Sequence, residues 1–359
     1  MRLFSLLLLL LLLAAPVLAD ERYEGENSLF VDTVWEGEVE IDGILTVPPG
    51  VTLEIRPGTV VRFTPFDSNG DGIGEHELFV QGVLKAVGTA EAPILFTSTA
   101  AIPAPGDWGA INMMASEEEN LLAHCRIEYG YRGFHAHFSR AALQDCLLQH
   151  NIRGAQFQES TVSLRRCQLL DNGHGLQFRN SDVTLEALEV ARSFWGVRGL
   201  YSTVALRDSI IAKNRAGGVH LRDSTVEITR CRFDGNRRGL YLQRSEGRVN
   251  GNWIASSREY GILLEKSHCD LERNRLILNQ RGGLKWVDAQ GLFHRNDLVN
   301  NGLYAAVNEG TTPLDARGNW WGGQAPRLRD GRHRPGDALI DASVASSAPF
   351  FPEPVTKRR

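Results

Sequence analysis

Residues 167–178 read CQLLDNGHGLQF, and the same order of residue types recurs throughout residues 121–321. Residues 146–157 (CLLQHNIRGAQF) and 231–242 (CRFDGNRRGLYL) are two further copies. Successive copies start 21 to 23 residues apart, and a fixed period of this length is typical of a solenoid in which every repeat forms one coil. The copies start at Cys125, Cys146, Cys167, Leu188, Ser209, Cys231, Asn252, Asn274, Asn296 and Asn319.

Apolar and polar residues alternate inside each repeat, as at Val162 and Leu164 and again at Leu176 and Phe178. Period-two alternation predicts short, half-buried strands, and the Asn, Gly and Ser residues between them predict turns. Three short strands per repeat predict a triangular coil, in which each strand pairs in parallel with its equivalent about 4.8 Å away in the next coil. A leucine-rich repeat would need a helical segment that the sequence lacks.

Two residue types recur at the predicted turns. Asn151 and Asn172 each stand five positions after the start of a copy. We expect these asparagines to adopt the left-handed backbone conformation and to hydrogen-bond the next coil through their amides. Glycines further along the repeat predict tight bends in which a Cβ atom would clash. They are Gly154, Gly175, Gly239, Gly261 and Gly283.

The repeat has the form V-x-L-x-x-(C/N)-x-(I/L)-x-x-N-x-x-G-(I/L)-x-(L/F), and it is accompanied by alternating residues 51–63, GDWGAI at 106–111 and GNWWG at 318–322. These features resemble the right-handed parallel β-helix superfamily, the pectin-lyase-like proteins. They are most similar to bacterial proteins described as right-handed β-helix or periplasmic copper-binding β-helix proteins. The resemblance implies an all-β, single-stranded right-handed parallel β-helix of about eleven to thirteen coils. It implies no single activity, because this fold hosts lyases, hydrolases, epimerases and non-enzymes.

The two ends of the chain differ from the repeats. Arg2, a run of leucines and the small residue Ala19 predict that residues 1–19 are a signal peptide, so that the protein is exported to the periplasm or outside the cell. An uncleaved anchor is the alternative, but the apolar run is short for a membrane span, which needs about 20 residues. The remaining segments are an N-terminal cap with the first coils, the regular repeats, and a C-terminal cap with a tail. Their predicted bounds are 20–120, 121–321 and 322–359.

Charge is distributed unevenly along the chain. Residues 20–120 carry 19 acidic and 4 basic side chains, whereas residues 121–320 carry 27 basic and 20 acidic side chains. A basic solenoid favours an anionic partner such as an acidic polysaccharide. The alternative is that these charges only keep the coils solvated and apart. Nucleic acid is not a predicted partner, because the exported chain lacks interleaved aromatic and basic residues.

A polar loop interrupts the strand pattern at residues 64–77. Asp67, Asn69 and Asp71 alternate oxygen-bearing side chains as in the first half of an EF-hand-type loop, which is a pattern that suits calcium. The final ligand position of such a loop is Leu78 rather than a glutamate, so the full pattern fails unless Glu75 or Glu77 replaces it. A plain polar loop is the alternative. The predicted calcium ligands are Asp67, Asn69, Asp71 and Glu75.

Four of the five cysteines, Cys125, Cys146, Cys167 and Cys231, share the first position of their repeats. Stacked coils bring neighbouring Cα atoms to about 4.8 Å, inside the range of a disulfide, but side chains in register point the same way. Buried free thiols are therefore predicted, with Cys125–Cys146 or Cys146–Cys167 as the pair for a bridge if one forms. No CxxC pair indicates zinc or haem.

A polar stripe is predicted on the outer side of one strand. If that strand buries Phe134, Leu176 and Leu240, the residues between them face outward. Amide, imidazole, guanidinium and phenol groups suit hydroxyl and carboxylate recognition, and the resemblance implies a sugar site on this kind of face. The alternative is a merely solvated surface. The stripe residues are His135, His137, Gln156, Gln158, Gln177, Arg179, His220, Arg222, Tyr241 and Gln243.

The sequence offers no complete catalytic set. A glycosidase needs two carboxyl groups about 5 to 9 Å apart on one face, and Glu265 is the one acidic residue among the outward positions of these strands, since Asp182, Asp208 and Asp223 fall in turns or other columns. The copper binding that the resemblance implies is not supported. Soft copper sites favour Met or Cys ligands, and Met113 and Met114 are the only methionines that remain after signal removal. The sequence favours a non-catalytic protein that binds a polysaccharide or another envelope polymer. A carbohydrate-active enzyme (polysaccharide lyase, glycoside hydrolase or epimerase) and a structural scaffold are the alternatives.

Overall fold

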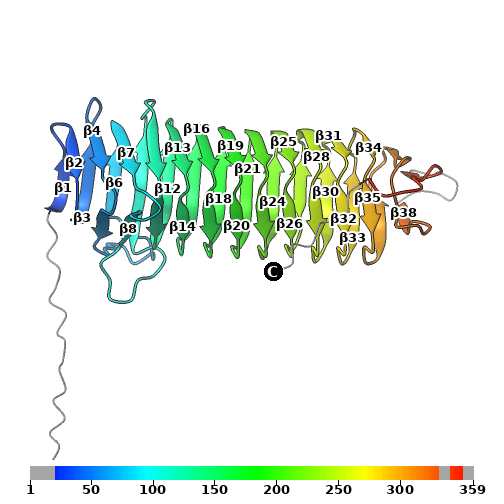
Figure 1. The fold of residues 1–359 in the computed structure, drawn as a ribbon, viewed down its shortest axis with the longest axis horizontal. Helices are drawn as coiled ribbons and strands as arrows, with labels where there is room; N and C mark the ends of the chain where they lie inside the picture. Colours follow the sequence, from blue (N-terminus) through cyan, green and yellow to red (C-terminus); the bar gives the residue numbers. More distant parts are fainter. Residues whose placement is uncertain (1–20, 331–339, 351–359) are drawn as a thin grey trace, which may run out of the picture.

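The computed structural model describes residues 21–330 and 340–350. These residues form a rod of stacked β-coils (Figure 1). The described part contains strands and turns but no helix, and therefore no helix that could span a membrane. The predicted signal peptide, residues 1–19, lies outside the described residues, as does the end of the predicted tail, residues 351–359.

Each complete coil contributes one strand to each of three faces, and every strand pairs in parallel with its equivalent in the next coil. The first face, here called the long-strand face, holds the longest strands of the repeats. It comprises β6 (Glu77–Val80), β9 (Trp108–Met114), β12 (Gly130–His137), β15 (Arg153–Gln158), β18 (His174–Arg179), β21 (Trp195–Leu200), β24 (Gly217–Arg222), β27 (Leu240–Gln243), β30 (Tyr260–Glu265), β33 (Gly282–Val287), β36 (Tyr304–Asn308) and β38 (Leu328–Asp330).

The other two faces are the short-strand face and the third face. The short-strand face comprises β5 (Val60–Phe63), β8 (Ile94–Ser98), β11 (Cys125–Glu128), β14 (Leu147–Gln149), β17 (Gln168–Leu170), β20 (Glu189–Ala191), β23 (Ile210–Ala212), β26 (Arg232–Asp234), β29 (Trp253–Ala255), β32 (Arg275–Ile277) and β35 (Asp297–Val299). The third face comprises β2 (Thr33–Trp35), β4 (Thr52–Ile55), β7 (Val83–Val87), β10 (Asn120–Ala123), β13 (Arg140–Gln144), β16 (Thr161–Arg165), β19 (Asp182–Glu186), β22 (Thr203–Arg207), β25 (Thr225–Thr229), β28 (Glu246–Asn250), β31 (His268–Glu272) and β34 (Phe293–His294).

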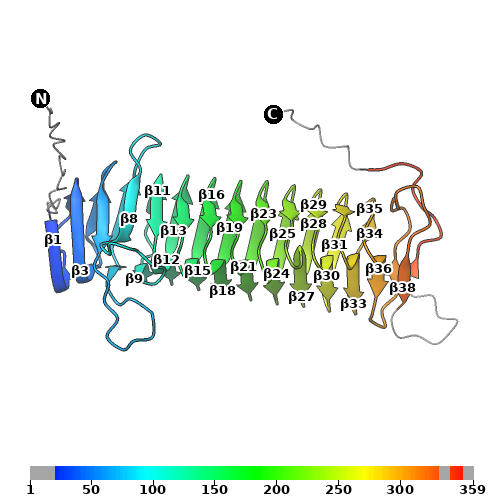
Figure 2. The same cartoon turned by 90° about the horizontal axis from the view of Figure 1, so that it is seen from below.

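The remaining strands lie at the two ends of the rod, β1 (Glu21–Ser28) and β3 (Glu38–Val47) at the first end and β37 (Leu314–Asp315) and β39 (Ile340–Asp341) at the last. The third face has 12 strands in the described chain, and the incomplete coils at the ends bring the stack to about 14 turns. The all-β parallel solenoid predicted from the period is confirmed, and it has slightly more turns than the eleven to thirteen coils expected. Figure 2 shows the coils in register, with loops projecting near the N-terminal end.

The first strand of the rod was not predicted. β1 reads ERYEGENS and lacks an apolar alternation, yet it pairs with β3 along its whole length. Its Tyr23 ring lies 5.8 Å from that of Trp35, which is fully buried. A charged strand at the end of the stack covers the core and discourages pairing with another chain, because charges are unfavourable on an unpaired sheet edge.

The left-handed residues at the corners of the coils are not the asparagines that were predicted. In one coil the left-handed residues are Asp171, Asn180 and Ala187, with φ of 54°, 48° and 54°. Each stands one position before a buried residue, so Asn172 itself is not the left-handed residue. Non-Gly residues rarely adopt this conformation, and the corner repeats it in many coils because the hydrogen bonds of the following residue hold it in place.

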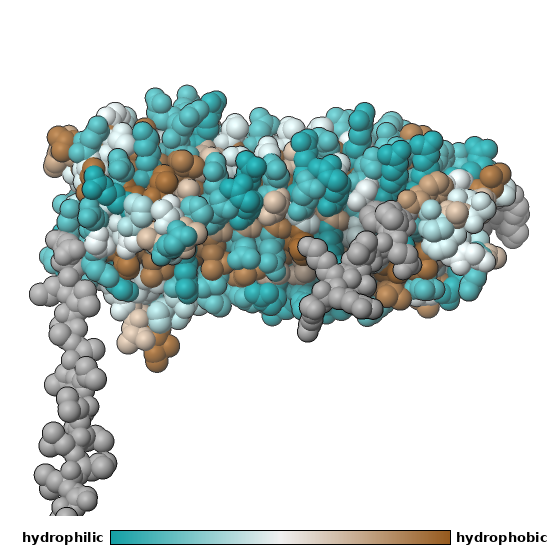
Figure 3. Space-filling model, viewed as in Figure 1, coloured by the Kyte–Doolittle hydropathy of each residue, from teal (hydrophilic) through white to brown (hydrophobic). Residues whose placement is uncertain are grey.

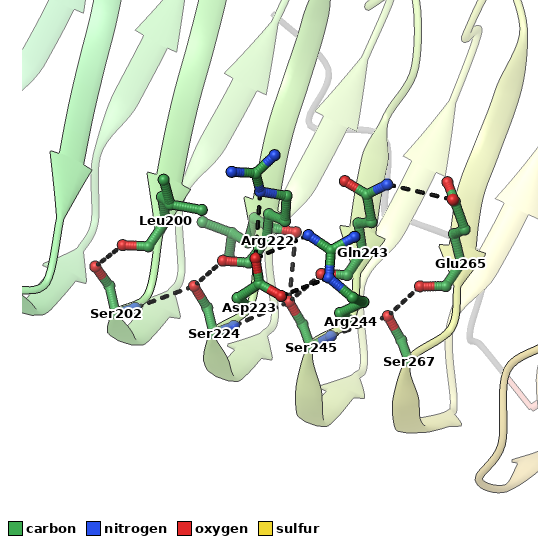
Figure 4. Close-up of polar contacts among 11 residues, drawn as sticks. Leu200, Ser202, Arg222, Asp223, Ser224, Gln243, Arg244, Ser245, Glu265 and Ser267 are labelled. Atoms are coloured by element: carbon green, nitrogen blue, oxygen red, sulfur yellow. Dashed lines mark hydrogen bonds and ion pairs between the residues drawn. The ribbon is translucent and has the colours of Figure 1, made fainter.

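The buried residue after each turn links the coils, as predicted for Asn. The Asn172 Oδ1 accepts hydrogen bonds from the backbone N–H and the amide of Asn151, at 2.9 and 3.1 Å. A file of serines also links successive coils by hydrogen bonds at the next corner, and it was not predicted from the sequence. There the Ser224 N–H donates to Ser245 Oγ at 3.2 Å and the Ser224 hydroxyl donates to Arg222 O at 2.8 Å (Figure 4).

The core is a continuous apolar column, and the cysteines belong to it. All five cysteines are free and buried, which confirms the predicted thiols. The Cys167 Sγ donates to Leu143 O and Arg165 O, both at 3.4 Å. The thiol therefore takes the place of the side-chain amide of the asparagines that start the later repeats. Burial raises the pKa of Cys231 and Cys269 to about 12, and thiols held protonated in this way are poor nucleophiles.

Candidate functional site

The predicted stripe lies on the long-strand face as two parallel files. Six neighbouring strands of this face are in register, so equivalent side chains stand one above another. They are β12, β15, β18, β21, β24 and β27. The first file contains His135, Gln156, Gln177, Arg198, His220 and Tyr241. The second contains His137, Gln158, Arg179, Leu200, Arg222 and Gln243. Arg198 and Leu200 of β21 complete the files and were missed.

The coil of β21 departs from the repeat at an inward position. Its neighbours place Phe178 and Leu221 in the core, whereas β21 has Gly199 there. A Cβ atom at Gly199 would overlap the Phe178 ring, and it would come within 2.7 Å of Leu221 Cδ2. The Phe178 ring therefore occupies space that a side chain of β21 would have filled. The surface above is hollowed into a depression of about 220 Å³, here called the Gly199 depression.

Three guanidinium groups line the Gly199 depression, those of Arg179, Arg198 and Arg222. The other lining residues are neutral, and no carboxylate is among them. They are Gln156, Phe157, Gln158, Gln177, Phe178, Gly199, Leu200 and His220. Low-dielectric walls around like charges strengthen their field, so the depression favours an anion.

Four arginines at the corners of the coils differ from these three, because each pairs with an aspartate of the preceding coil. Figure 4 shows Arg244 beside Asp223, with its Nε 2.6 Å from Oδ1. The same bidentate arrangement joins Arg166 to Asp145, Arg192 to Asp171 and Arg230 to Asp208. These charges stabilise the corners and leave little field outside.

The arginines of the Gly199 depression are compensated far less. In the described residues, neither Arg179 nor Arg198 forms an ion pair within 4.0 Å. In the described residues Arg222 forms a single ion pair, from its Nε to Asp223 Oδ2 at 3.3 Å (Figure 4). Figure 3 shows hydrophilic residues over most of the side seen in Figure 1, with apolar patches among them.

His220 and Tyr241 continue the first file beside the depression. Their rings stack with centroids 4.3 Å apart and planes inclined by 6°. Burial, aided by the charge of Arg198, lowers the pKa of His220 to about 4, so the imidazole is neutral at pH 7. Both of its ring nitrogens are buried without a hydrogen-bond partner. Burial and the hydrogen bond to Glu265 raise the pKa of Tyr241 to about 12.

His135, at the N-terminal end of the first file, is not on the exposed surface, although it was predicted to face outward. Its side chain is 4% exposed, and its Nδ1 lies 2.8 Å from Asn112 Oδ1. Burial lowers the pKa of His135 to about 3. His137 is partly exposed and stacks on Phe138 at 4.2 Å. The structure therefore separates this end of the stripe from the Gly199 depression.

Aromatic side chains flank the depression on the same coil. Phe194 stands just before β21 and Tyr201 just after it, and they are 45% and 50% exposed. Trp195 lies beneath the Arg198 guanidinium, whose Cζ is 5.6 Å from its ring centroid. Arg179 lies over the Tyr201 ring in the same way, at 5.8 Å. One coil thus supplies the hollow, a central cation and two exposed rings.

The predicted calcium ligands lie on the loop between β5 and β6. Asp67 accepts from the backbone of Gly70 and Gly72, at 2.7 and 2.8 Å. Asn69 and Asp71 each accept from the backbone two residues later, and Glu75 accepts from the Ser68 hydroxyl. No group of three or more His, Cys, Asp or Glu in the described residues is arranged to hold a metal. Calcium binding by this loop stays a prediction.

Stacked coils with aligned side-chain files and one arginine-lined depression define a solenoid with a candidate ligand site on one β-face. Residues 29–134 match the family described as pectate-lyase like beta helix domain, and residues 154–320 match the family described as right handed beta helix region. Together these two β-helix family models match most of residues 29–320, and the β-helix that they describe is the fold observed here. A comparison with curated proteins finds no match.

Solved structures with this architecture include enzymes that act on polysaccharides. The periplasmic alginate epimerase AlgG is 13% identical over 82% of this chain and 74% of its own, with a TM-score of 0.41. The A-module of the mannuronan C-5 epimerase AlgE4 from Azotobacter vinelandii is 12% identical over 90% and 91%, with a TM-score of 0.39. An alginate lyase from Paenibacillus sp. str. FPU-7 is 11% identical over 80% and 93%, with a TM-score of 0.26. At these identities and scores the likeness concerns the fold alone.

Proposed function

We propose that this protein is an exported enzyme that acts on an acidic polysaccharide at the Gly199 depression, as a lyase or an epimerase of uronate units. The observation that carries the proposal is the set of three guanidinium groups, Arg179, Arg198 and Arg222, around a hollow whose lining holds no carboxylate. Planar guanidinium groups match carboxylates in shape and charge, and they bind them more strongly than neutral donors do. A uronate carboxylate is therefore the ligand that the site favours.

Neutralising a uronate carboxylate makes the hydrogen on the adjacent carbon, C5, more acidic. In a lyase reaction a base removes that proton, the C4–O bond breaks, a C4–C5 double bond forms and the leaving oxygen takes a proton. In an epimerase reaction the base keeps that proton, and C5 takes a different proton on its opposite face from a second donor, such as a phenol or water. His220 is neutral and beside the arginines, so it is the proton acceptor that the site offers, and Tyr241 is a phenol that keeps its proton at pH 7.

One observation favours a second function, which is binding without catalysis. Both ring nitrogens of His220 are buried under its neighbours Trp195 and Tyr241, with ring centroids 5.7 and 4.3 Å away. The imidazole has to turn before either nitrogen can contact a sugar. If it does not turn, the depression holds the polymer without changing it, which is the non-catalytic function favoured by the sequence.

Binding and product formation test the proposal separately. Titration calorimetry with alginate, pectate and a neutral glucan measures binding, and absorbance of unsaturated uronate, reducing-end release and NMR of the sugar ring measure turnover. Alginate comes first because it is named for the similar structures. We expect affinity for an acidic polymer and none for the neutral one. Product formation supports the enzyme, and affinity without product supports the binding protein.

Variants of the depression identify the site. Arg198→Ala removes one charge-assisted contact, worth about 1.5 to 3 kcal/mol, so Kd should rise roughly 10- to 150-fold. Arg192→Ala is the matched control, because Arg192 precedes the same strand but pairs with Asp171. Equal affinity of Arg198→Ala and the wild type for every acidic polymer, or no binding by the wild type, would refute the proposal.

A further inference from the structure

The two exposed rings of the β21 coil point to the path of the polymer. Phe194 and Tyr201 stand at opposite ends of the same strand, with Arg198 between them. Six extended residues span about 20 Å, which is longer than one sugar ring. Exposed aromatic rings provide flat apolar surfaces, and the C–H side of a sugar ring packs on such surfaces. The spacing therefore suits a chain of several sugars rather than one.

A polymer that followed the rod axis would meet a repulsive group. Arg222, Gln243 and Glu265 stand in register on successive coils. The Glu265 carboxylate lies two coils beyond Arg222 toward the C-terminal end, where it holds Tyr241 and Gln243. A carboxylate in the path disfavours a polyanion, because like charges repel at close range.

The path across the rod has the opposite character. The Arg215 guanidinium lies over the Phe194 ring, with its Cζ 5.7 Å from the ring centroid, and extends the positive charge past that end. At the other end, Glu159 and Asp182 line a hollow beyond Tyr201. Those carboxylates end the favourable path at Tyr201. The positive surface therefore runs from Arg215 to Tyr201, parallel to β21.

We infer that the acidic polysaccharide crosses the solenoid along β21, with sugar rings on Phe194 and Tyr201 and a carboxylate at Arg198, instead of following the rod axis. This inference rests on the proposed function, since it needs an acidic polymer to bind at the Gly199 depression. It assigns two sugar-stacking positions on either side of the depression. It also sets a direction that the sequence analysis did not predict, because the predicted stripe followed the axis.

Four variants distinguish the two paths. Phe194→Ala and Tyr201→Ala remove the proposed stacking positions. Phe138→Ala is the matched control, because Phe138 is also 50% exposed and occupies the corner position of Tyr201 three coils away. Lys285→Ala tests the axial path on the C-terminal side, where Lys285 follows Tyr241 in the first file. Circular dichroism and thermal unfolding establish that each variant is folded.

Calorimetry with acidic oligosaccharides from dimer to hexamer gives the readout. We expect the wild-type affinity to rise with length. Loss of an aromatic contact of about 0.5 to 1.5 kcal/mol corresponds to a roughly two- to twelvefold higher Kd for the hexamer in Phe194→Ala and Tyr201→Ala. The dimer should be affected least, so these two variants should also flatten the dependence on length. Phe138→Ala and Lys285→Ala should match the wild type.

The outcomes separate this inference from the proposed function. Hexamer binding that is weakened by Phe138→Ala or Lys285→Ala, and unaffected by Phe194→Ala and Tyr201→Ala, overturns the crossing path and leaves an acidic-polymer site in place. Absence of binding by the wild type at every length overturns the proposed function and this inference together. Weakening confined to the two β21 variants supports both.

Discussion

The asparagine file offers the sharpest quantitative test of the fold, at Asn236. Its Oδ1 accepts from the backbone N–H and the amide of Asn214, both at 3.0 Å, and its Nδ2 donates to Ile211 O at 2.8 Å. The side chain is fully buried. Asn236→Ala therefore removes three hydrogen bonds at once and leaves their partners buried.

The expected loss follows from those contacts. A typical hydrogen bond contributes about 1 kcal/mol net, and a buried polar group left without a partner costs about 1 to 3 kcal/mol. Three lost bonds predict that Asn236→Ala lowers the free energy of unfolding by about 3 to 5 kcal/mol. Asn236→Ser should lose less, because Ser193 and Ser257 occupy the same position in other coils. Lys213→Ala, at the exposed turn before Asn214, is the surface control and should change little.

Urea unfolding followed by circular dichroism measures the loss, and native-state hydrogen exchange locates it. Coils of a solenoid contact only their neighbours, so exchange should accelerate most at the Asn214 amide and at the adjoining coils. A change below about 1 kcal/mol in Asn236→Ala, with unchanged exchange at Asn214, would show that the file does not hold the coils together.

Three further outcomes are expected. Millimolar calcium should raise the Tm of the wild type but not of Asp67→Ala, and identical melting with and without calcium would remove the predicted site. The free energy of unfolding should fall as the pH drops below about 4. The paired arginines lower the folded-state pKa of four carboxyl groups, those of Asp145, Asp171, Asp208 and Asp223. Their stabilisation is present above the unfolded-state pKa and is lost as these groups become protonated. High salt should weaken that dependence, and a pH curve equal to that of the four-fold Asp→Asn variant would contradict the assignment. A thiol reagent should modify almost none of the cysteines in the native protein. After unfolding without reductant it should modify all five, and a lower number of modified thiols would reveal a disulfide.

The repeat made most of the fold predictable, because the period fixes which residues stack. The cysteine file, the Asn hydrogen bonds between coils and the two outward files all follow from the register. The left-handed turn residues were assigned one position too late, to Asn172 rather than Asp171. Intrinsic preference favours Asn there, but the bonds of the following residue impose the same conformation on Arg192 and Leu278 (φ 57° at both). Tertiary context overrides local preference at these corners.

The ends and the site were harder to predict, for a different reason. β1 has no apolar alternation, and only its pairing with β3 makes it a strand. The Gly199 depression lies at a coil whose inward residue is glycine, a feature that a search for chemical groups passes over. The signal was present, since the inward position of β21 holds Gly where the neighbouring coils have Phe178 and Leu221.

The proposed site lies at a coil that departs from the repeat. In other coils a corner arginine pairs with an aspartate of the preceding coil, as Arg166 does with Asp145, and the inward position holds an apolar side chain such as Phe178 or Leu221. The β21 coil instead leaves Gly199 empty of side chain and Arg198 without an ion pair in the described chain. The Phe178 ring fills the inward space beside Gly199, whereas the positive charge of Arg198 stays uncompensated beside Arg179 and Arg222, and like charges repel. An anionic ligand would offset that repulsion, which is why we place the acidic polymer at this coil and not elsewhere along the stripe.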